Sequence, residues 1–306
     1  MPADEEPKYT GTIAGYNCKF SIYENGVIYF EPADPTKTYT IPNSTSFSQY
    51  KSEITAVKAA DGLENVSTSA FDGFAQLSSI DLSECSTLKT LGNYVFRDCT
   101  LLTDINFGEN SPITSIGSRA FYNCTLLEQF PFEQLTNVET ISDYAFQYCS
   151  SLKLADLSKM TRLKSIPYQM FVDCTALKQV NFSKIAPITS IGRSAFSGCT
   201  SLEQFPFEQL PNVNRIDEYA FSGCKSLKSA DLSGMTKLTK IPNQMFNNCT
   251  SLTDINFGEN SPITSIGQYA FNGCTSLKSV DLSGMTQLTA IPNYMFPVSY
   301  THLRAH

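Results

Sequence analysis

The chain has 306 residues, its acidic residues outnumber its basic residues by 29 to 22 for a net charge of −7, and 42% of its residues are hydrophobic. A chain of this length can form one or two cored domains. The modest negative charge, without a cluster of Lys or Arg, gives no electrostatic basis for binding nucleic acid or an anionic membrane. No stretch of 18 apolar residues occurs and the N-terminal MPADEEPKYT is polar, so the sequence predicts neither membrane insertion nor a signal peptide in this chain.

The first part of the chain differs from the rest. Residues 1–12 are polar and are expected to form a flexible tether. Residues 13–51 predict a β-hairpin cap, because hydrophobic and polar residues alternate from Tyr16 to Ile22 and Asn25-Gly26 is typical of a type I′ turn. Such a cap would cover the apolar end of the first repeat.

A 25-residue repeat occupies residues 52–296. Phenylalanine recurs at a constant spacing of 25 from Phe71 to Phe296, and in eight repeats a cysteine follows three residues later, with a leucine three residues beyond it. These eight cysteines are Cys99, Cys124, Cys149, Cys174, Cys199, Cys224, Cys249 and Cys274. A repeat of this size cannot bury its apolar face alone, so neighbouring repeats must stack.

Each repeat reads L-x-x-h-x-h, a polar turn, h-x-x-I and then A/M/V-F-x-x-C, where h is hydrophobic. The h-x-h part, such as Ile105 to Phe107, has a period of two and predicts a short strand with one buried face. The segment from Ser142 to Cys149 places apolar residues at helical spacing behind a serine cap and predicts a short helical turn. The predicted fold class is therefore an α/β repeat solenoid.

The core pattern I-G/P-x-x-A-F-x-x-C-x-x-L resembles the hallmark of the BspA-like, or treponemal-type, leucine-rich repeats, and the match runs from about Ser52 to Phe296. The resemblance implies a right-handed leucine-rich repeat solenoid with a parallel sheet on its concave side and short helical turns on its convex side. It also implies an exported bacterial or protist surface protein that is linked to adhesion and protein binding.

The regularly spaced cysteines could suggest metal binding, but zinc sites need paired ligands such as C-x-x-C or a mixed His/Cys shell, and neither is present. We interpret the cysteines as small buried hydrophobic residues, with disulfides between neighbouring repeats as the alternative. Cys18 and Cys85 lie outside the series and could be free. The phenylalanine and leucine ladders are expected to form the core, and the tyrosines that precede the phenylalanines are expected on the convex surface.

Few residues suited to catalysis are present. The chain has no Trp, and its two histidines, His302 and His306, fall within the last five residues. No P-loop, G-x-G-x-x-G, G-x-S-x-G or H-E-x-x-H string occurs. The sequence therefore predicts a non-catalytic protein with no cofactor and no metal site.

A binding function would be carried by the solvent-facing positions of the predicted strands and their neighbours, which are polar and acidic. The candidate residues are Asp81, Asp104, Asn106, Gln129, Glu133, Asp156, Gln179, Asn181, Gln204, Glu208, Asp231, Asp254, Asn256 and Asp281. Asp and Asn between two apolar residues also suit the turn that follows, so part of this pattern fits strand solubility alone.

Two functional hypotheses follow. The first is an extracellular or cell-surface, adhesin-like module that binds a protein or glycoprotein. The alternative is an intracellular interaction scaffold or a structural spacer without a specific ligand. Residues 297–306, PVSYTHLRAH, break the repeat, because the register predicts cysteine and leucine where Ser299 and His302 stand. We expect this tail not to be native, since it resembles a translated sequencing adapter.

Overall fold

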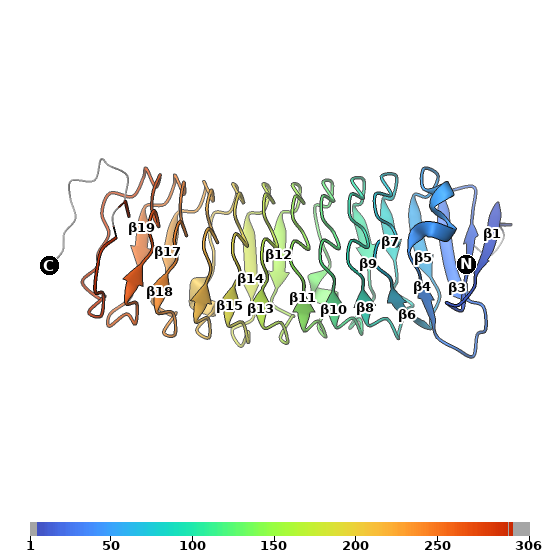
Figure 1. Ribbon diagram of the computed structural model, residues 1–306, viewed down its shortest axis with the longest axis horizontal. Helices are drawn as coiled ribbons and strands as arrows, with labels where there is room; N and C mark the ends of the chain where they lie inside the picture. Colours follow the sequence, from blue (N-terminus) through green and yellow to red (C-terminus); the bar gives the residue numbers. More distant parts are fainter. Residues whose placement is uncertain (1–4, 293, 296–306) are drawn as a thin grey trace. The chain divides into compact units, whose positions relative to one another are not determined.

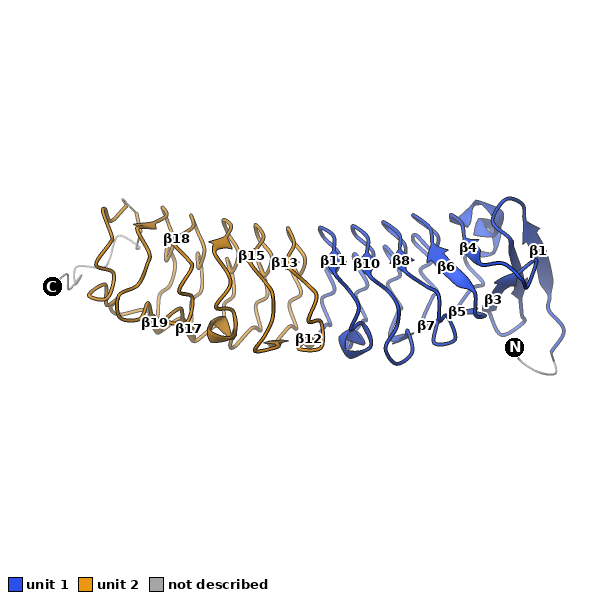
Figure 2. Cartoon of the chain, turned by 90° about the horizontal axis from the view of Figure 1, so that it is seen from below, with its two compact units in different colours: residues 1–152 blue, residues 153–306 orange. Residues whose placement is uncertain are grey.

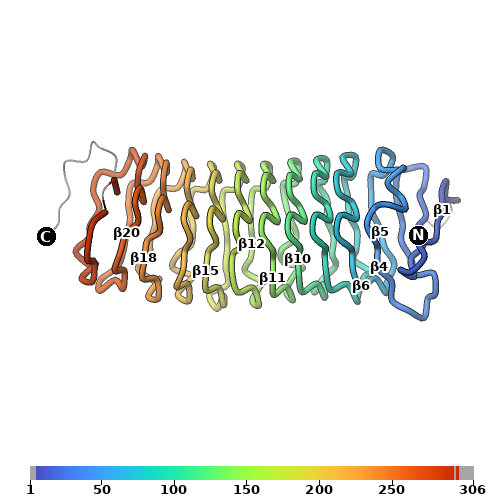
Figure 3. Tube along the Cα trace, in the orientation of Figure 1, coloured from blue at the N-terminus to red at the C-terminus, as the bar shows by residue number. Residues whose placement is uncertain are grey.

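The computed structural model describes residues 5–292, 294 and 295, and the chain divides into two compact units, residues 1–152 (unit 1) and 153–306 (unit 2) (Figure 2). In each unit the chain winds in successive turns that lie side by side, as the tube in Figure 3 shows. Each unit is thus a parallel β-solenoid, which confirms the predicted stacking of repeats. Residues 1–4, Phe296 and the predicted tail 297–306 lie outside the described residues.

Unit 1 begins with an antiparallel sheet of three strands, β1 (Tyr9–Ile13), β2 (Cys18–Ile22) and β3 (Val27–Pro32) (Figure 1). The β2–β3 pair confirms the predicted hairpin, but the predicted type I′ turn is wrong, because Gly26 has a φ of 81° whereas Asn25 does not have positive φ. The expectation of a flexible tether is wrong for residues 9–12, because β1 pairs with β2 along its whole length. The ring of Tyr9 also stacks on that of Tyr50, with centroids 4.4 Å apart, which holds this edge strand in place.

Two parallel ladders follow in unit 1, although the sequence predicts one strand per repeat. The h-x-h parts continue the sheet from β3 through β5 (Ala56–Ala59), β7 (Ser79–Asp81) and β9 (Asp104–Asn106). The second ladder consists of β4 (Tyr39–Ile41), β6 (Leu63–Val66), β8 (Thr90–Leu91), β10 (Ser115–Ile116) and β11 (Thr140–Ile141). It forms at the h-x-x-I part, where Ile116 is buried and the Gly117 N–H donates to the Leu91 carbonyl at 2.8 Å.

Unit 2 repeats this arrangement. Its h-x-h strands are β12 (Leu154–Leu157) paired with β14 (Gln179–Phe182), and β17 (Ser229–Asp231) paired with β19 (Asp254–Asn256). Its second set comprises β13 (Ser165–Ile166), β15 (Ser190–Ile191), β16 (Arg215–Ile216), β18 (Lys240–Ile241) and β20 (Ser265–Ile266). All of these pairs are parallel and in register at a spacing of one repeat.

The h-x-h segments centred on Pro131 and Pro206 are not strands. Proline has no N–H to donate to the ladder, so the backbone leaves the sheet and forms the 3₁₀ helices η3 (Phe132–Gln134) and η4 (Phe207–Gln209). The prediction of a strand position is therefore wrong for a set of candidate residues. These are Gln129, Glu133, Gln204 and Glu208, and Asp281 also lies outside the strands.

The segments around the ladder phenylalanines are turns, and the prediction of helical turns is wrong. The residues two positions before and two positions after each ladder phenylalanine from Phe71 to Phe271 have positive φ, for example Arg119 at 53° and Asn123 at 59°. A right-handed helical turn needs negative φ at every residue, so the apolar spacing reflects a folded-back turn instead. All helices of the described residues are 3₁₀ helices, including η1 (Ser44–Ser46) and η2 (Ser48–Tyr50).

The phenylalanine ladder forms the centre of each unit, as predicted. In unit 1 the rings of Phe71 and Phe96 stack with centroids 5.4 Å apart, and in unit 2 those of Phe196 and Phe221 do so at the same distance. These four side chains are fully buried. All ten cysteines are also buried and none is in a disulfide, which supports their interpretation as core residues over the disulfide alternative.

Candidate functional site

The fourteen candidate residues all lie at the surface, exposed or half-buried. On the strands this follows from alternation, since Asp81 lies between the buried Ile80 and Leu82. In unit 1, β7 and β9 bring Asp81, Asp104 and Asn106 together on one sheet face. Gln129 and Glu133 follow them in the chain but lie outside the sheet.

The middle position of each h-x-h strand has a structural role. The side-chain Oδ1 of Asp81 accepts the N–H of Ser83 at 3.2 Å, and that of Asp231 accepts the N–H of Ser233 at 3.0 Å. The amide of Asn256 donates to Asp231 at 3.0 Å, which links two neighbouring turns. The same type of turn follows Asn106, Asp156, Asn256 and Asp281. The interpretation that these residues suit the following turn is thus confirmed.

A surface hollow of about 630 Å³ in unit 2 collects five of the candidate residues. They come from β14, from the segment around Pro206 and from β17: Gln179, Asn181, Gln204, Glu208 and Asp231. The hollow is also lined by residues that were not among the predicted candidates: Lys178, Val180, Glu203, Phe205, Pro206, Gln209 and Ser229. We call this surface the unit 2 hollow.

The hollow lies where the h-x-h ladder is interrupted. The Phe182 N–H cannot find a strand partner in the segment of Pro206, and it donates instead to the side-chain Oε1 of Gln209 at 3.4 Å. In unit 1 a glutamine side chain likewise takes the place of the strand partner, since the Phe107 N–H donates to Gln134 Oε1 at 2.7 Å. The repeated string EQFPFEQL, with proline at the middle position, is the sequence signal that could have predicted this interruption.

The polar groups of the hollow suit hydrogen bonding more than catalysis. Glu203 is paired with Lys228, with Nζ and Oε2 3.1 Å apart, and Gln179 donates to Asn181 at 2.6 Å. Glu208 and Asp231 add exposed carboxylates on the same surface. Amides and carboxylates in an open hollow can receive a basic or hydroxyl-rich group of a ligand.

The described residues contain neither a metal-binding cluster nor a membrane-spanning helix. Across residues 5–292, 294 and 295, no group of three or more His, Cys, Asp and Glu side chains could hold a metal ion. Within the same residues, no helix is both long and apolar enough to cross a bilayer.

Burial raises the pKa of the thiols, for Cys18 and Cys85 to about 12, so these groups are poor nucleophiles.

The geometry defines a protein of the leucine-rich repeat class: stacked short repeats with an h-x-h strand, an aliphatic second strand and a phenylalanine–cysteine turn. The sequence matches the BspA type leucine rich repeat region in six copies, over residues 34–153 and 164–302. The chain belongs to this family, as its repeat motif predicts.

Solved structures with similar folds include several bacterial leucine-rich repeat proteins. A leucine rich cell surface protein from Faecalibacterium prausnitzii is 21% identical, with 89% of this chain and 82% of that chain covered and a TM-score of 0.46. The T. pallidum leucine rich repeat protein is 19% identical, with 87% and 90% covered and a TM-score of 0.36. The pneumococcal vaccine antigen PcpA is 15% identical, with 94% and 93% covered and a TM-score of 0.37. No curated protein matches the chain.

Proposed function

We propose that the chain is a non-catalytic, cell-surface module that binds a protein or glycoprotein through its h-x-h side, with the unit 2 hollow as the main contact. The observation that carries this proposal is the hollow itself. It gathers amide and carboxylate groups from three consecutive repeats around a volume of about 630 Å³. Polar groups of this kind fit the polar rim of protein interfaces.

The adhesin-like role and the location at the cell surface are parts of this proposal, and both rest on the membership of the BspA-type family. We propose further that the antiparallel sheet β1–β2–β3 serves as the cap of the repeat array, because β3 pairs in parallel with the first h-x-h strand, β5. A sheet in this position would protect the first repeat from pairing with other chains.

A structural spacer is the second candidate, and one observation favours it. The middle-position Asp and Asn side chains accept hydrogen bonds from the N–H groups of the turns that follow, as Asp231 does from Ser233. Such residues need no ligand to explain their presence. An intact gene with an upstream signal or lipid-anchor sequence would favour the binding module, and its absence would favour the intracellular spacer.

The experiment compares two double variants by surface plasmon resonance against candidate matrix and cell-surface proteins. Gln204→Lys with Glu208→Lys changes the charge of the hollow. The control, Glu259→Lys with Gln287→Lys, makes the same change of charge at exposed positions that do not line it. We expect only the first variant to lose binding. The difference between this variant and the wild type should be smaller at high salt, because salt screens the changed charges and the Debye length is only about 10 Å at 0.1 M.

Equal binding by the wild type and both variants would move the site away from the hollow. Failure of every candidate protein to bind the wild type would support the structural spacer. The unfolding midpoint of each variant is measured alongside, because a folding defect would otherwise imitate a loss of binding.

A further inference from the structure

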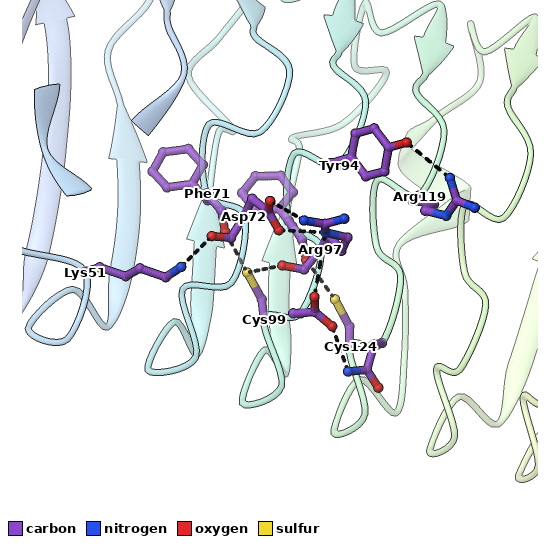
Figure 4. A network of polar contacts seen from close by, with 11 residues as sticks. Lys51, Phe71, Asp72, Tyr94, Arg97, Cys99, Arg119 and Cys124 are labelled. Atoms are coloured by element: carbon purple, nitrogen blue, oxygen red, sulfur yellow. Dashed lines mark hydrogen bonds and ion pairs between the residues drawn. The ribbon is translucent and has the colours of Figure 1, made fainter. Parts of the chain in front are cut away.

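A second surface stands out at the turns of unit 1. Tyr94, Arg119 and Tyr144 each precede a ladder phenylalanine by two residues, so stacking at 25 residues per turn places them in one column. The guanidinium carbon of Arg119 lies 4.0 Å from the ring centroid of Tyr144 and 5.6 Å from that of Tyr94. Its Nη1 donates to the Tyr94 hydroxyl at 3.1 Å (Figure 4). The two rings therefore hold the guanidinium in a defined position.

Arg119 lines a pocket of about 670 Å³ whose other side is aromatic. The rings of Tyr122 and Tyr148 meet edge to face there, with centroids 5.3 Å apart. Tyr148 is 37% exposed although its ring is large. The pocket thus combines one guanidinium with two partly exposed rings, and Tyr and Arg are the residues that dominate the binding energy of protein interfaces.

The other charged groups of the pocket are already paired. Arg97 donates to both carboxylate oxygens of Asp72, from Nε at 2.8 Å and from Nη2 at 2.6 Å (Figure 4). Asp98 accepts the amide of Asn123 at 2.8 Å and lies 3.6 Å from the Nε of Arg97.

The guanidinium of Arg119 differs from that of Arg97. In the part of unit 1 that the structure describes, no carboxylate oxygen lies within 4.0 Å of its nitrogens, and its one side-chain hydrogen bond goes to Tyr94. A guanidinium has five N–H donors in a planar fork that matches a carboxylate. Most donors of Arg119 are therefore available to a ligand at the pocket.

We propose that this pocket binds an acidic segment of a partner protein. A carboxylate of the segment accepts the fork of Arg119, and a neighbouring apolar side chain packs on Tyr122 and Tyr148. Because Arg119 is held by two rings before binding, little side-chain entropy is lost when the ion pair forms. This inference concerns other residues than the unit 2 hollow and does not rest on the function proposed for it.

Unit 2 contains an uncharged counterpart of the same column. Gln244 occupies the position of Arg119 and donates to the Tyr219 hydroxyl at 2.8 Å. The positions of Tyr122 and Tyr148 are taken there by Asn247 and Gly273. The fold thus accepts glutamine in place of the arginine and glycine in place of the tyrosine, which supplies well-matched substitutions for a test.

The test uses fluorescence anisotropy with the full chain and a labelled hexapeptide of alternating glutamate and tyrosine. A hexapeptide of alternating glutamine and tyrosine is the control probe. We expect the acidic peptide to bind at least tenfold more tightly than the control. Arg119→Gln should weaken its binding about tenfold or more, since a hydrogen bond to a charged group is worth about 1.5–3 kcal/mol. Tyr148→Gly should also weaken it, because the ring on which the apolar side chain packs is lost. Gln244→Ala in unit 2 should leave it unchanged.

The proposal would be overturned by no saturable binding of the acidic peptide, by equal binding of both peptides, or by an unchanged affinity of Arg119→Gln. Binding of a carboxylated polysaccharide in place of the acidic peptide would also overturn it in favour of a glycan site. Thermal unfolding of each variant checks that the turn is intact. Arg119→Lys keeps the charge but not the fork and should bind with intermediate affinity.

Discussion

The thiol of Cys99 donates its hydrogen to the main-chain carbonyl oxygen of Phe71, with Sγ and O 3.2 Å apart. Because the two residues are 28 positions apart, the thiol of one repeat binds the phenylalanine carbonyl of the preceding repeat (Figure 4). The same bond, at 3.1 to 3.3 Å, recurs for Cys124, Cys149, Cys199, Cys224, Cys249 and Cys274. The cysteine is therefore both a small core residue and a hydrogen-bond donor between repeats.

Protonated thiols should make the protein sensitive to alkali. Burial raises the pKa of Cys149 and Cys274 to about 12, above the ordinary value of 9.0. Well below pH 9 these thiols are protonated in both the folded and the unfolded state, so they contribute no pH dependence to the free energy of unfolding. As the pH rises from 9 towards 12, the unfolded chain releases protons that the folded chain keeps, so stability falls by up to about 1.4 kcal/mol per pH unit for each thiol.

Urea unfolding at pH 8 and pH 10 measures this effect. Cys149→Ala should reduce the pH dependence of the free energy of unfolding by the contribution of about one proton. Native alkylation at pH 7.5 supplies the second measurement, with all ten thiols expected to react slowly. Rapid alkylation of the folded protein, or equal midpoints at both pH values, would contradict the prediction.

The phenylalanine ladder should dominate the stability of each unit. Phe171 is fully buried and stacks on Phe196 with centroids 5.5 Å apart. Phe171→Ala should lower the free energy of unfolding by about 3–5 kcal/mol, because the neighbouring turns cannot collapse into the space. Ile185→Ala is the control, since this side chain is 77% exposed and should change stability by less than about 0.5 kcal/mol. Chemical denaturation compares the two, and a similar small effect of both would show that the ladder is not core.

The glutamine that replaces a strand partner should also matter for stability. Gln134 accepts the Phe107 N–H at 2.7 Å and donates to Asn106 at 3.2 Å. Gln134→Ala should cost about 1–3 kcal/mol, because the N–H loses its partner. The exposed Gln129 lies in the same segment, and Gln129→Ala should have little effect. Thermal unfolding measures both variants. A similar loss of stability in both would argue against the role of Gln134 as hydrogen-bond partner of the Phe107 N–H.

The left-handed turn positions should tolerate only certain residues. Gly223 has a φ of 75°, and the nearest atom to a Cβ built there is 3.6 Å away, so space is not the limit. Gly223→Val should cost about 1–2 kcal/mol from its backbone conformation alone. Gly223→Asn should cost less, since Asn248 adopts φ 59° at the corresponding position of the next turn. Equal stability of both variants would show that this turn relaxes to negative φ.

The repeat motif was sufficient to predict much of the fold. A spacing of 25 with Phe, Cys and Leu in fixed positions predicts stacked repeats, because each apolar set must be covered by its neighbours. The hairpin at Asn25-Gly26 was likewise predicted, although its turn is not of type I′. The helical turns were wrong, since apolar spacing does not reveal the sign of φ, and Tyr, Arg, Asn, Asp and Gly all occupy the left-handed positions.

Of the candidate site, the sequence predicted which side chains lie at the surface, because alternation along a strand is a local property. It did not predict that Pro206 removes a strand and leaves a hollow beside Gln179 and Asp231, since that depends on the partners the segment loses.

The sequence by itself determined the repeat length, the core ladders and the polar character of the h-x-h positions, because these are properties of one repeat read along the chain. Only the tertiary structure decided which residues of different repeats meet. Tyr94, Arg119 and Tyr144 are ordinary polar residues until stacking places the guanidinium carbon of Arg119 4.0 Å from the ring centroid of Tyr144 and 5.6 Å from that of Tyr94. The physical reason is that a column perpendicular to the strands joins residues one repeat apart, and its contacts depend on the backbone turns that aim each side chain.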